Sequence, residues 1–106
     1  MSNRNKTNRQ QGRRPWPRNI VSVTIDENGK KRYTYRQFRW FPQWLEYADT
    51  IKEQSKELAF FDAISKYGCC EIEPTDLQGE ALDYFNNEVR PELDSQHEIM
   101  RKGGRV

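Results

Sequence analysis

The sequence has few apolar residues and no long apolar run. Hydrophobic residues make up 34% of the 106 positions, whereas about 45–50% is usual for globular domains on a closely similar scale. No stretch approaches the ~20 apolar residues that a membrane-spanning helix needs. The polar start MSNRNKTNRQQGRRP also lacks the apolar core of a signal peptide. These absences predict one small cytoplasmic domain with no membrane attachment.

Residues that usually carry catalysis or bind metals are also scarce. Cys69 and Cys70 are adjacent, which does not suit a disulfide framework, and because a vicinal disulfide is strained and rare we expect two reduced thiols. The one histidine, His97, lies on a polar stretch distant in sequence from them, which makes a poor metal site. Glu71 and Glu73 could in principle hold a cation, but a run of acids is usually a solvated face. No serine stands in a sequence pattern typical of an activated nucleophile, and no glycine-rich phosphate-binding loop is present. We therefore predict no enzyme activity, catalytic residue, metal or cofactor.

The first 18 residues contain no acidic side chain, although the net charge of the whole chain is only +2. Residues 1–18 contain six basic side chains and no acid, and residues 19–41 carry a net charge of +3. Residues 42–98 contain fourteen acids and four bases, and residues 99–106 add +3. The chain therefore has a basic front, an acidic helical body and a basic tail.

Residues 1–18 form a basic arm with almost nothing to bury. Such a segment cannot offset the entropy of its ordering, so we expect it to be disordered when free. Its arginines could bind nucleic-acid phosphates by releasing counterions. Alternatively, the arm is a solubilising tail, or it docks on the acidic helices. Trp16 in RPWPR could stack on a base or pin the arm to the core.

Residues 19–41 are predicted to form a β-hairpin. The β-branched run Ile20–Ile25 precedes the turn Asp26–Gly29, and the return strand is expected over Lys31–Trp40. The Asn-Gly pair of the turn supplies the positive φ values that hairpin turns need. A lone hairpin is only marginally stable, so it must pack on helices or pair with another chain.

The return strand has two faces, and its functional interpretation stays open. Tyr33 and Tyr35 share one face by alternation. The other face mixes arginines with Phe38 and Trp40, which is compatible with binding single-stranded nucleic acid. For the hairpin taken alone we favour the alternative, in which the two aromatic residues belong to the core and the arginines protect an exposed edge strand.

Residues 42–101 are predicted to form a helical domain around the central segment Glu57–Gly68. Apolar residues recur there at helical spacing, with Leu58 as the first core residue and Phe61 as a main core position. Ser55 is the expected N-cap and Gly68 the expected stop of this helix. A shorter helix, Gln43–Glu53, is expected before it, after Pro42 at the first turn.

A third helix is predicted after an N-cap at Thr75. Pro91 should kink this helix, because proline removes a hydrogen bond and clashes with the preceding turn. Residues 102–106 are expected to be a flexible basic tail. The apolar stripe of this helix comprises Leu77, Ala81, Leu82, Phe85, Val89 and Leu93.

Several motifs occur together between Phe38 and Arg105. They include the segment Asp62–Gly68, DAISKYG, and the closing KGGR of Lys102–Arg105. With them this stretch resembles a family of small phage, prophage and mobile-element domains of unknown function. Relatives often form the amino-terminal part of phage replication-associated proteins, so the resemblance implies mobile-element replication but no mechanism or site residues. The arm and hairpin look like an addition, and relatives often continue into a further domain. The remaining matching residues are Trp40, Phe41, Trp44, Leu58, Leu77, Gly79, Ala81, Phe85, Val89, Pro91 and Leu93.

We therefore predict an α+β, mainly α fold, in which an N-terminal β-hairpin packs on a compact three-helix domain with a Pro-kinked last helix. The predicted function is a non-catalytic accessory protein of a phage or mobile element that binds nucleic acid, DNA or RNA, electrostatically. The alternative is a protein–protein interaction module, an adapter or inhibitor, that uses the acidic helices or pairs two copies through the hairpin edge. The candidate nucleic-acid-binding residues are Arg4, Arg9, Arg13, Arg14, Trp16, Arg18, Arg32, Tyr35, Arg36 and Arg39.

Overall fold

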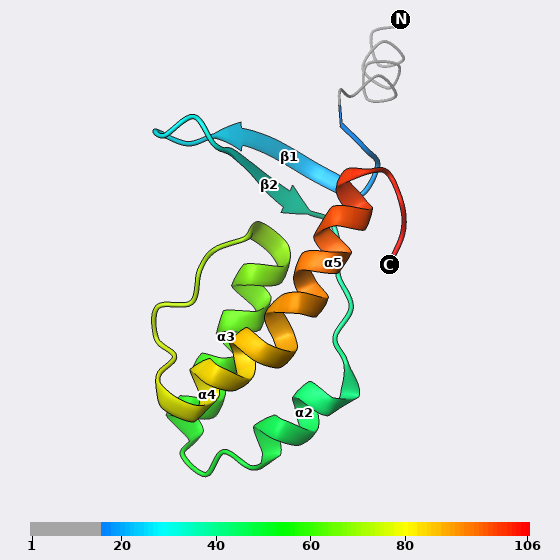
Figure 1. Ribbon diagram of the computed structural model, residues 1–106. Coiled ribbons are helices and arrows are strands. Elements are labelled where there is room, and N and C mark those ends of the chain that lie inside the picture. The colour runs from blue at the N-terminus through cyan, green and yellow to red at the C-terminus, as the bar shows by residue number, and fades with distance from the viewer. Residues whose placement is uncertain (1–15) are drawn as a thin grey trace, which may run out of the picture.

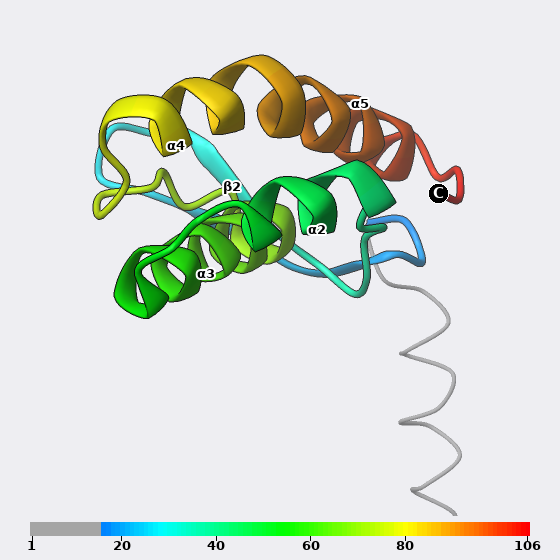
Figure 2. The same cartoon turned by 90° about the horizontal axis from the view of Figure 1, so that it is seen from below.

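The computed structural model describes residues 16–106, in which a β-hairpin lies across one end of a helical body (Figure 1). The antiparallel strands are β1 (Ile20–Ile25) and β2 (Lys31–Tyr35). The helices are α2 (Pro42–Asp49), α3 (Gln54–Cys70), α4 (Gly79–Tyr84), the π-helical turn η1 (Phe85–Val89) and α5 (Arg90–Arg101). The last three are continuous and form one long rod beside α2 and α3 (Figure 2). This arrangement confirms the predicted mainly helical α+β fold.

The predicted arm falls mostly on residues 1–15, which lie outside the described residues. Among residues 16–106 no helix combines the length and the apolar character needed to span a bilayer.

The hairpin turn is organised by one carboxylate. Asp26 Oδ1 accepts hydrogen bonds of 2.9 Å from the backbone N–H groups of both Asn28 and Lys30. Gly29 alone in this turn has a positive φ, +81°, so the expectation for the Asn-Gly pair holds only for its glycine. The Asp26 carboxylate therefore stabilises the turn by accepting hydrogen bonds from its backbone, as aspartate side chains often do in turns.

The return strand is shorter than predicted and ends at Tyr35, not Trp40. Beyond Tyr35 the backbone forms hydrogen bonds with a side chain of α5. The side-chain amide of Gln96 accepts from the Arg39 N–H at 2.7 Å and donates to the Arg39 carbonyl at 3.0 Å. A side-chain amide thus replaces a strand partner at this position. Phe38 and Trp40, which follow the end of the strand, pack against the helices and are half-buried there. Their assignment to the core was therefore correct.

The main core fills the space between α2, α3 and the α4–α5 rod. Phe60 and Ile64 of α3 are fully buried there, whereas Leu58 is 59% exposed and Phe61 only half-buried. The prediction that Leu58 is a core residue was therefore wrong. Phe61 packs against the core but is not one of its buried residues. Leu58 lies two residues from Phe60, about 200° around the helix, and so faces solvent. The other fully buried apolar residues of this core are Trp44, Ala48, Phe85, Val89 and Leu93.

Both predicted ends of α3 need correction. The helix begins after Glu53, not Ser55, and it continues past Gly68 to Cys70. Gly68 serves packing instead, because a Cβ atom there would lie 2.5 Å from the Phe38 ring. Glu71 ends the helix with a left-handed backbone, φ +58°, a conformation that favours glycine.

The third helix starts later than predicted and divides where predicted. It begins at Gly79 and not after Thr75, because the positive φ of Gly79, +59°, prevents a right-handed helix from continuing backwards. In η1 the Arg90 N–H bonds to the Phe85 carbonyl five residues earlier. This wider turn directly precedes Pro91, whose ring would clash with an α-helical turn at that point.

The C-terminal segment is anchored, in contrast to the predicted flexible tail. The N–H of Gly104 donates to the Ile99 carbonyl at 2.9 Å. Val106 packs with Trp16 against a second, smaller core cluster of Ile20, Tyr35 and Met100. The tail thus closes over the hairpin.

The structure joins Cys69 and Cys70 in a vicinal disulfide, which contradicts the expected reduced thiols. Both residues lie half-buried in the last turn of α3. Their Cα atoms are 3.8 Å apart, the spacing of an ordinary trans peptide.

Candidate functional site

Segments that carry basic residues and lie far apart in the sequence meet at the hairpin end of the molecule (Figure 1). The Asn19 Nδ2 group donates a 2.7 Å hydrogen bond to the Gly104 carbonyl, which fixes the start of the hairpin to the tail across 85 residues. The carboxyl end of α5 lies beside this junction. We call this region the basic end; its cations are Arg18, Lys30, Lys31, Arg32, Arg36, Arg39, Arg101, Lys102 and Arg105.

The opposite end carries the opposite charge. It consists of α2, the first half of α3, and the α4–η1 part of the rod with its preceding loop, residues 42–62 and 75–88 (Figure 2). Against nine acids it contains only two lysines, Lys52 and Lys56. The charge division of the sequence therefore becomes a division in space. The acids of this acidic end are Glu46, Asp49, Glu53, Glu57, Asp62, Asp76, Glu80, Asp83 and Glu88.

Arg36 and Arg39 are exposed on a fixed backbone at the basic end. The Arg36 N–H donates to the Asn19 carbonyl at 2.8 Å, and the Arg36 Nε group lies 3.5 Å from the carbonyl of Arg18. The backbone of Arg39 is held by the Gln96 amide. Within residues 16–106 neither guanidinium group forms an ion pair with a carboxylate, so the loop that joins β2 to α2 presents two positive charges at the surface.

Three candidate residues have structural contacts that change their predicted role. Tyr35 is 3% exposed, so its ring cannot stack on a base. Arg32 donates to Asp26 at 3.4 Å and to the Glu71 carbonyl at 3.2 Å. Trp16 is half-buried in the second cluster, and so it pins the chain to the core, one of its two predicted roles.

Of the other candidates, Arg36 lies beside Arg18, whose carbonyl accepts from its Nε group, and Arg39 lies in the same loop against Gln96 of α5. Arg4, Arg9, Arg13 and Arg14 lie outside the described residues.

A partly buried polar junction connects the hairpin to α3 and α5. The Tyr35 hydroxyl donates to Glu71 Oε2 at 2.6 Å. One guanidinium nitrogen of Arg101 lies 2.8 Å from that hydroxyl and 2.9 Å from the same carboxylate oxygen. Burial, and next the bond to Glu71, raise the pKa of the Tyr35 hydroxyl well above its ordinary value. The left-handed backbone that Glu71 adopts is tolerated because its carboxylate holds three elements together.

His97 completes this junction from α5. Its ring stacks on Tyr35 with centroids 4.2 Å apart and is 1% exposed. Nε2 lies 2.9 Å from the Gly68 carbonyl, so Nε2 carries the proton and donates. Nδ1 has no hydrogen-bond partner within residues 16–106 and lies 3.6 Å from Glu71 Oε2. Burial lowers the pKa of His97, against smaller opposing contributions from Gly68 and Glu71.

A second polar group binds the end of α3 to the rod. The Tyr67 hydroxyl donates to Asp94, and burial together with this bond raises the pKa of Tyr67 to about 12. Arg90 pairs with both oxygens of Glu73, at 2.8 and 2.9 Å. The same guanidinium lies 4.9 Å above the Tyr67 ring, a cation–π distance. Glu73 is therefore already neutralised by a protein cation.

The sequence interpretation missed three residues of this region, namely His97, Gln96 and Glu71. His97 and Gln96 looked like members of a polar stretch, yet both are buried. Extending the apolar stripe beyond Leu93 by three, four and seven residues reaches Gln96, His97 and Met100, so the helical period could have found them. For Glu71 no comparable signal exists, because its role depends on the left-handed end of α3.

The junction is built for holding elements together, because its charged and polar groups mainly satisfy one another. Within residues 16–106 there is no group of three or more histidine, cysteine, aspartate or glutamate side chains placed to bind a metal ion.

Comparison with protein-family models, with curated proteins and with solved structures found no significant match to this chain.

Proposed function

We propose that this protein is a non-catalytic accessory protein that binds nucleic acid through its basic end. The observation that carries the proposal is that the hairpin, the loop that follows it and the end of α5, which meet at one end of the molecule (Figure 1), carry most of the cations of the described residues, while nine of the sixteen acids of the chain lie at the other end. On the resemblance to phage and mobile-element domains, we further propose that it acts in the replication of such an element.

The proposed contacts are to phosphates rather than to bases. Tyr35 and Trp16 are occupied by the core, so stacking is not part of the proposal. Arg36 and Arg39 stand exposed on a fixed backbone, and Lys30 and Lys31 lie exposed at the hairpin tip. Binding by such groups is sensitive to salt and weakly selective for sequence, because it depends on counterion release. The acidic end would be repelled from the same polyanion, which orients the protein on it.

A charge-reversal experiment with a matched control tests this proposal. The double variant Arg36→Glu/Arg39→Glu removes two cations from the basic end, and Lys52→Glu/Lys56→Glu makes the same change of charge at the acidic end. Fluorescence anisotropy with labelled single-stranded and duplex DNA and RNA should show at least about a tenfold loss for the first variant at low salt. The control should retain most of the affinity. Equal losses in both variants, or no binding by the parent chain, would overturn the proposal.

Removal of residues 1–15 measures the part of the arm that precedes Trp16. These residues carry five cations, Arg4, Lys6, Arg9, Arg13 and Arg14. If all five contact phosphates of a single strand, the slope of log affinity against log salt should become shallower by about 3.5, since each contact contributes about 0.7. An unchanged slope would remove the arm from the proposal and leave the basic end as the whole site.

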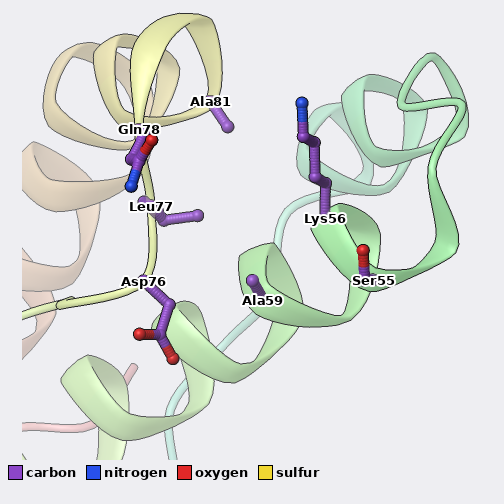
Figure 3. Close-up of a pocket in the computed structure, with 7 residues that line it drawn as sticks. All are labelled: Ser55, Lys56, Ala59, Asp76, Leu77, Gln78 and Ala81. Atoms are coloured by element: carbon purple, nitrogen blue, oxygen red, sulfur yellow. The ribbon is translucent and has the colours of Figure 1, made fainter.

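A groove at the acidic end supports a second candidate function, binding of a basic protein segment. The groove has a volume of about 400 Å³ and lies between α3 and the loop that leads into α4 (Figure 3). Ala59, Leu77 and Ala81 form its apolar part, and its lining also contains one acid, Asp76, and one base, Lys56. The surrounding acidic end makes the electrostatic environment of the groove negative as a whole. A segment with one aliphatic anchor and several lysines or arginines would complement both properties.

Two variants distinguish binding of nucleic acid at the basic end from binding of a basic peptide in the groove. Ala81→Trp should fill the groove, and it should weaken binding of a lysine-rich, leucine-containing peptide in calorimetry without changing affinity for nucleic acid. The Arg36→Glu/Arg39→Glu variant should have the reverse pattern. Peptide binding that Ala81→Trp leaves unchanged would rule out the groove as the peptide site.

A further inference from the structure

Within residues 16–106, the outer edge of β1 has backbone groups that no other strand covers. The sheet formed by these residues has two strands, and β2 lies on the side of α3. The Asp26 N–H bonds inward to the Lys30 carbonyl at 2.9 Å. Because inward and outward residues alternate along an antiparallel strand, Val23 and Ile25 turn their N–H and C=O groups to the outer edge.

This edge lacks the devices that usually prevent pairing between molecules. The strand sequence, IVSVTI, contains no lysine, no proline and no charge. Exposed edges are normally protected by such residues. Val21 and Ile25 are 42% and 64% exposed, although both are apolar and β-branched. The bulge between Ile20 and Ser22 interrupts the ladder at one end only and leaves Ser22–Ile25 regular.

Among residues 16–106, most of β1 lies away from the helical body. The strand is at the end of the described structure that faces away from α2 and α4, β2 lies between it and α3, and only its start at Ile20 contacts the carboxyl end of α5 (Figure 1). A strand added outside β1 would therefore extend the sheet away from its own helical body.

From these observations we infer that the protein forms a homodimer by antiparallel pairing of β1 with β1 of a second copy. A two-fold axis near Val23 sets Val21 of one copy opposite Ile25 of the other, so that the two exposed apolar residues cover each other. Arg18 precedes the strand and Glu27 follows it. Antiparallel pairing brings these opposite charges together at both ends, whereas parallel pairing would set like charges side by side.

Self-pairing explains why the occupant is a second copy rather than an unrelated peptide. The edge is complementary to itself in backbone direction, in apolar side chains and in flanking charge. The resulting four-stranded sheet would also pair backbone groups that the isolated hairpin leaves exposed to water. The inference does not rest on the proposed nucleic-acid function, and it is tested without nucleic acid.

Sedimentation equilibrium of the full chain over a wide range of concentrations tests the dimer. The monomer has a mass of 12.7 kDa, and the weight-average mass should rise towards twice that value. Ile25→Lys places a charge on the edge and should weaken association by about tenfold or more. Ile25→Pro should do the same, because it removes an outward N–H and keeps the hydrogen bonds to β2.

Leu58→Lys is the matched control, since Leu58 is similarly exposed, at 59%, and lies on α3 far from the hairpin. It should associate like the parent chain. A parent chain that stays monomeric at every concentration would overturn the inference. It would also be overturned if Ile25→Lys dimerises like the parent or if Leu58→Lys weakens the dimer equally. Should Ile25→Pro lose its fold by circular dichroism, the lysine variant decides the question.

Discussion

The two ends of this molecule are held together by different kinds of interaction. At the acidic end, large apolar side chains such as Trp44, Phe60 and Phe85 interlock and are fully buried. At the basic end, a small apolar cluster is supplemented by hydrogen bonds that converge on one carboxylate, Glu71. Apolar burial is non-directional and distributed over many contacts. A polar junction depends instead on a few groups in a fixed geometry.

Substitutions at the two ends should therefore have different effects. Damage to the apolar core should destabilise the whole domain, because all three helical segments contribute to it. Damage to the junction should loosen the hairpin from α3 and α5 while the helical core persists. The surface proposed to bind nucleic acid lies on the part with the fewer apolar contacts.

The largest effect is expected from Phe60→Ala or Phe85→Ala. Each ring is fully buried, and truncation should cost about 3–5 kcal/mol of unfolding free energy. Small domains hold only about 5–15 kcal/mol in total, so either variant should be close to unfolding at room temperature. Urea denaturation followed by circular dichroism measures the loss. Leu58→Ala is the control, with an expected change within about 0.5 kcal/mol; similar losses in all three variants would mean that the core is assigned wrongly.

A smaller and more local effect is expected from Glu71→Gln. The change keeps the side-chain size but removes the charge that Arg101 and the Tyr35 hydroxyl share, and the unfolding free energy should fall by about 1–3 kcal/mol. Hydrogen exchange should speed up for the amides of β1 and β2 more than for those of α2. The exposed pair of Glu98 with Lys102 offers the control Glu98→Gln, which should change little. Uniform acceleration across α2 and the hairpin would contradict a local role for the junction.

The smallest effect expected is a dependence of the stability on pH through His97. His97 has a pKa lowered by burial from its ordinary value of 6.5, so below that pH the unfolded chain binds more protons than the folded one. Stability should therefore begin to fall as the pH approaches 6.5 from above, and it should fall more steeply below that value. The slope cannot exceed about 1.4 kcal/mol per pH unit for one proton. Thermal melts across this range measure the change.

Because His97 is the single histidine of the chain, the His97→Phe variant isolates its contribution. Phenylalanine keeps a ring against Tyr35 but cannot take up a proton. The fall in stability just below pH 6.5 should become much smaller in this variant. An equal fall in both proteins would assign the effect to carboxylates instead.

The sequence could predict elements whose cause is local. The β-branched run before Asp26–Gly29 predicted the hairpin, and Pro91 predicted the division of the last helix, because turn chemistry and proline sterics act within a few residues. The mainly helical class followed from the apolar periodicity of the body, even though Leu58 was assigned to the wrong face.

Features that depend on long-range contacts could not be predicted in this way. The end of β2 is set by Gln96, 57 residues from Arg39. The role of Gly68 depends on the Phe38 ring, and that of Glu71 on Tyr35 and Arg101. Only the folded chain brings these partners together. The convergence of basic segments was likewise invisible in the sequence, although their charges were not.

The central claim is that the basic end, and not the acidic end, contacts nucleic acid. Amide spectra of the isotope-labelled full chain, recorded while a short single-stranded oligonucleotide is added, test it most directly. The account predicts progressive shifts at residues 30–39 and 101–105 that salt reverses, with α2 and α4 unchanged. Shifts confined to α2, α4 and the groove beside Ala81, or no shifts at low salt, would contradict it.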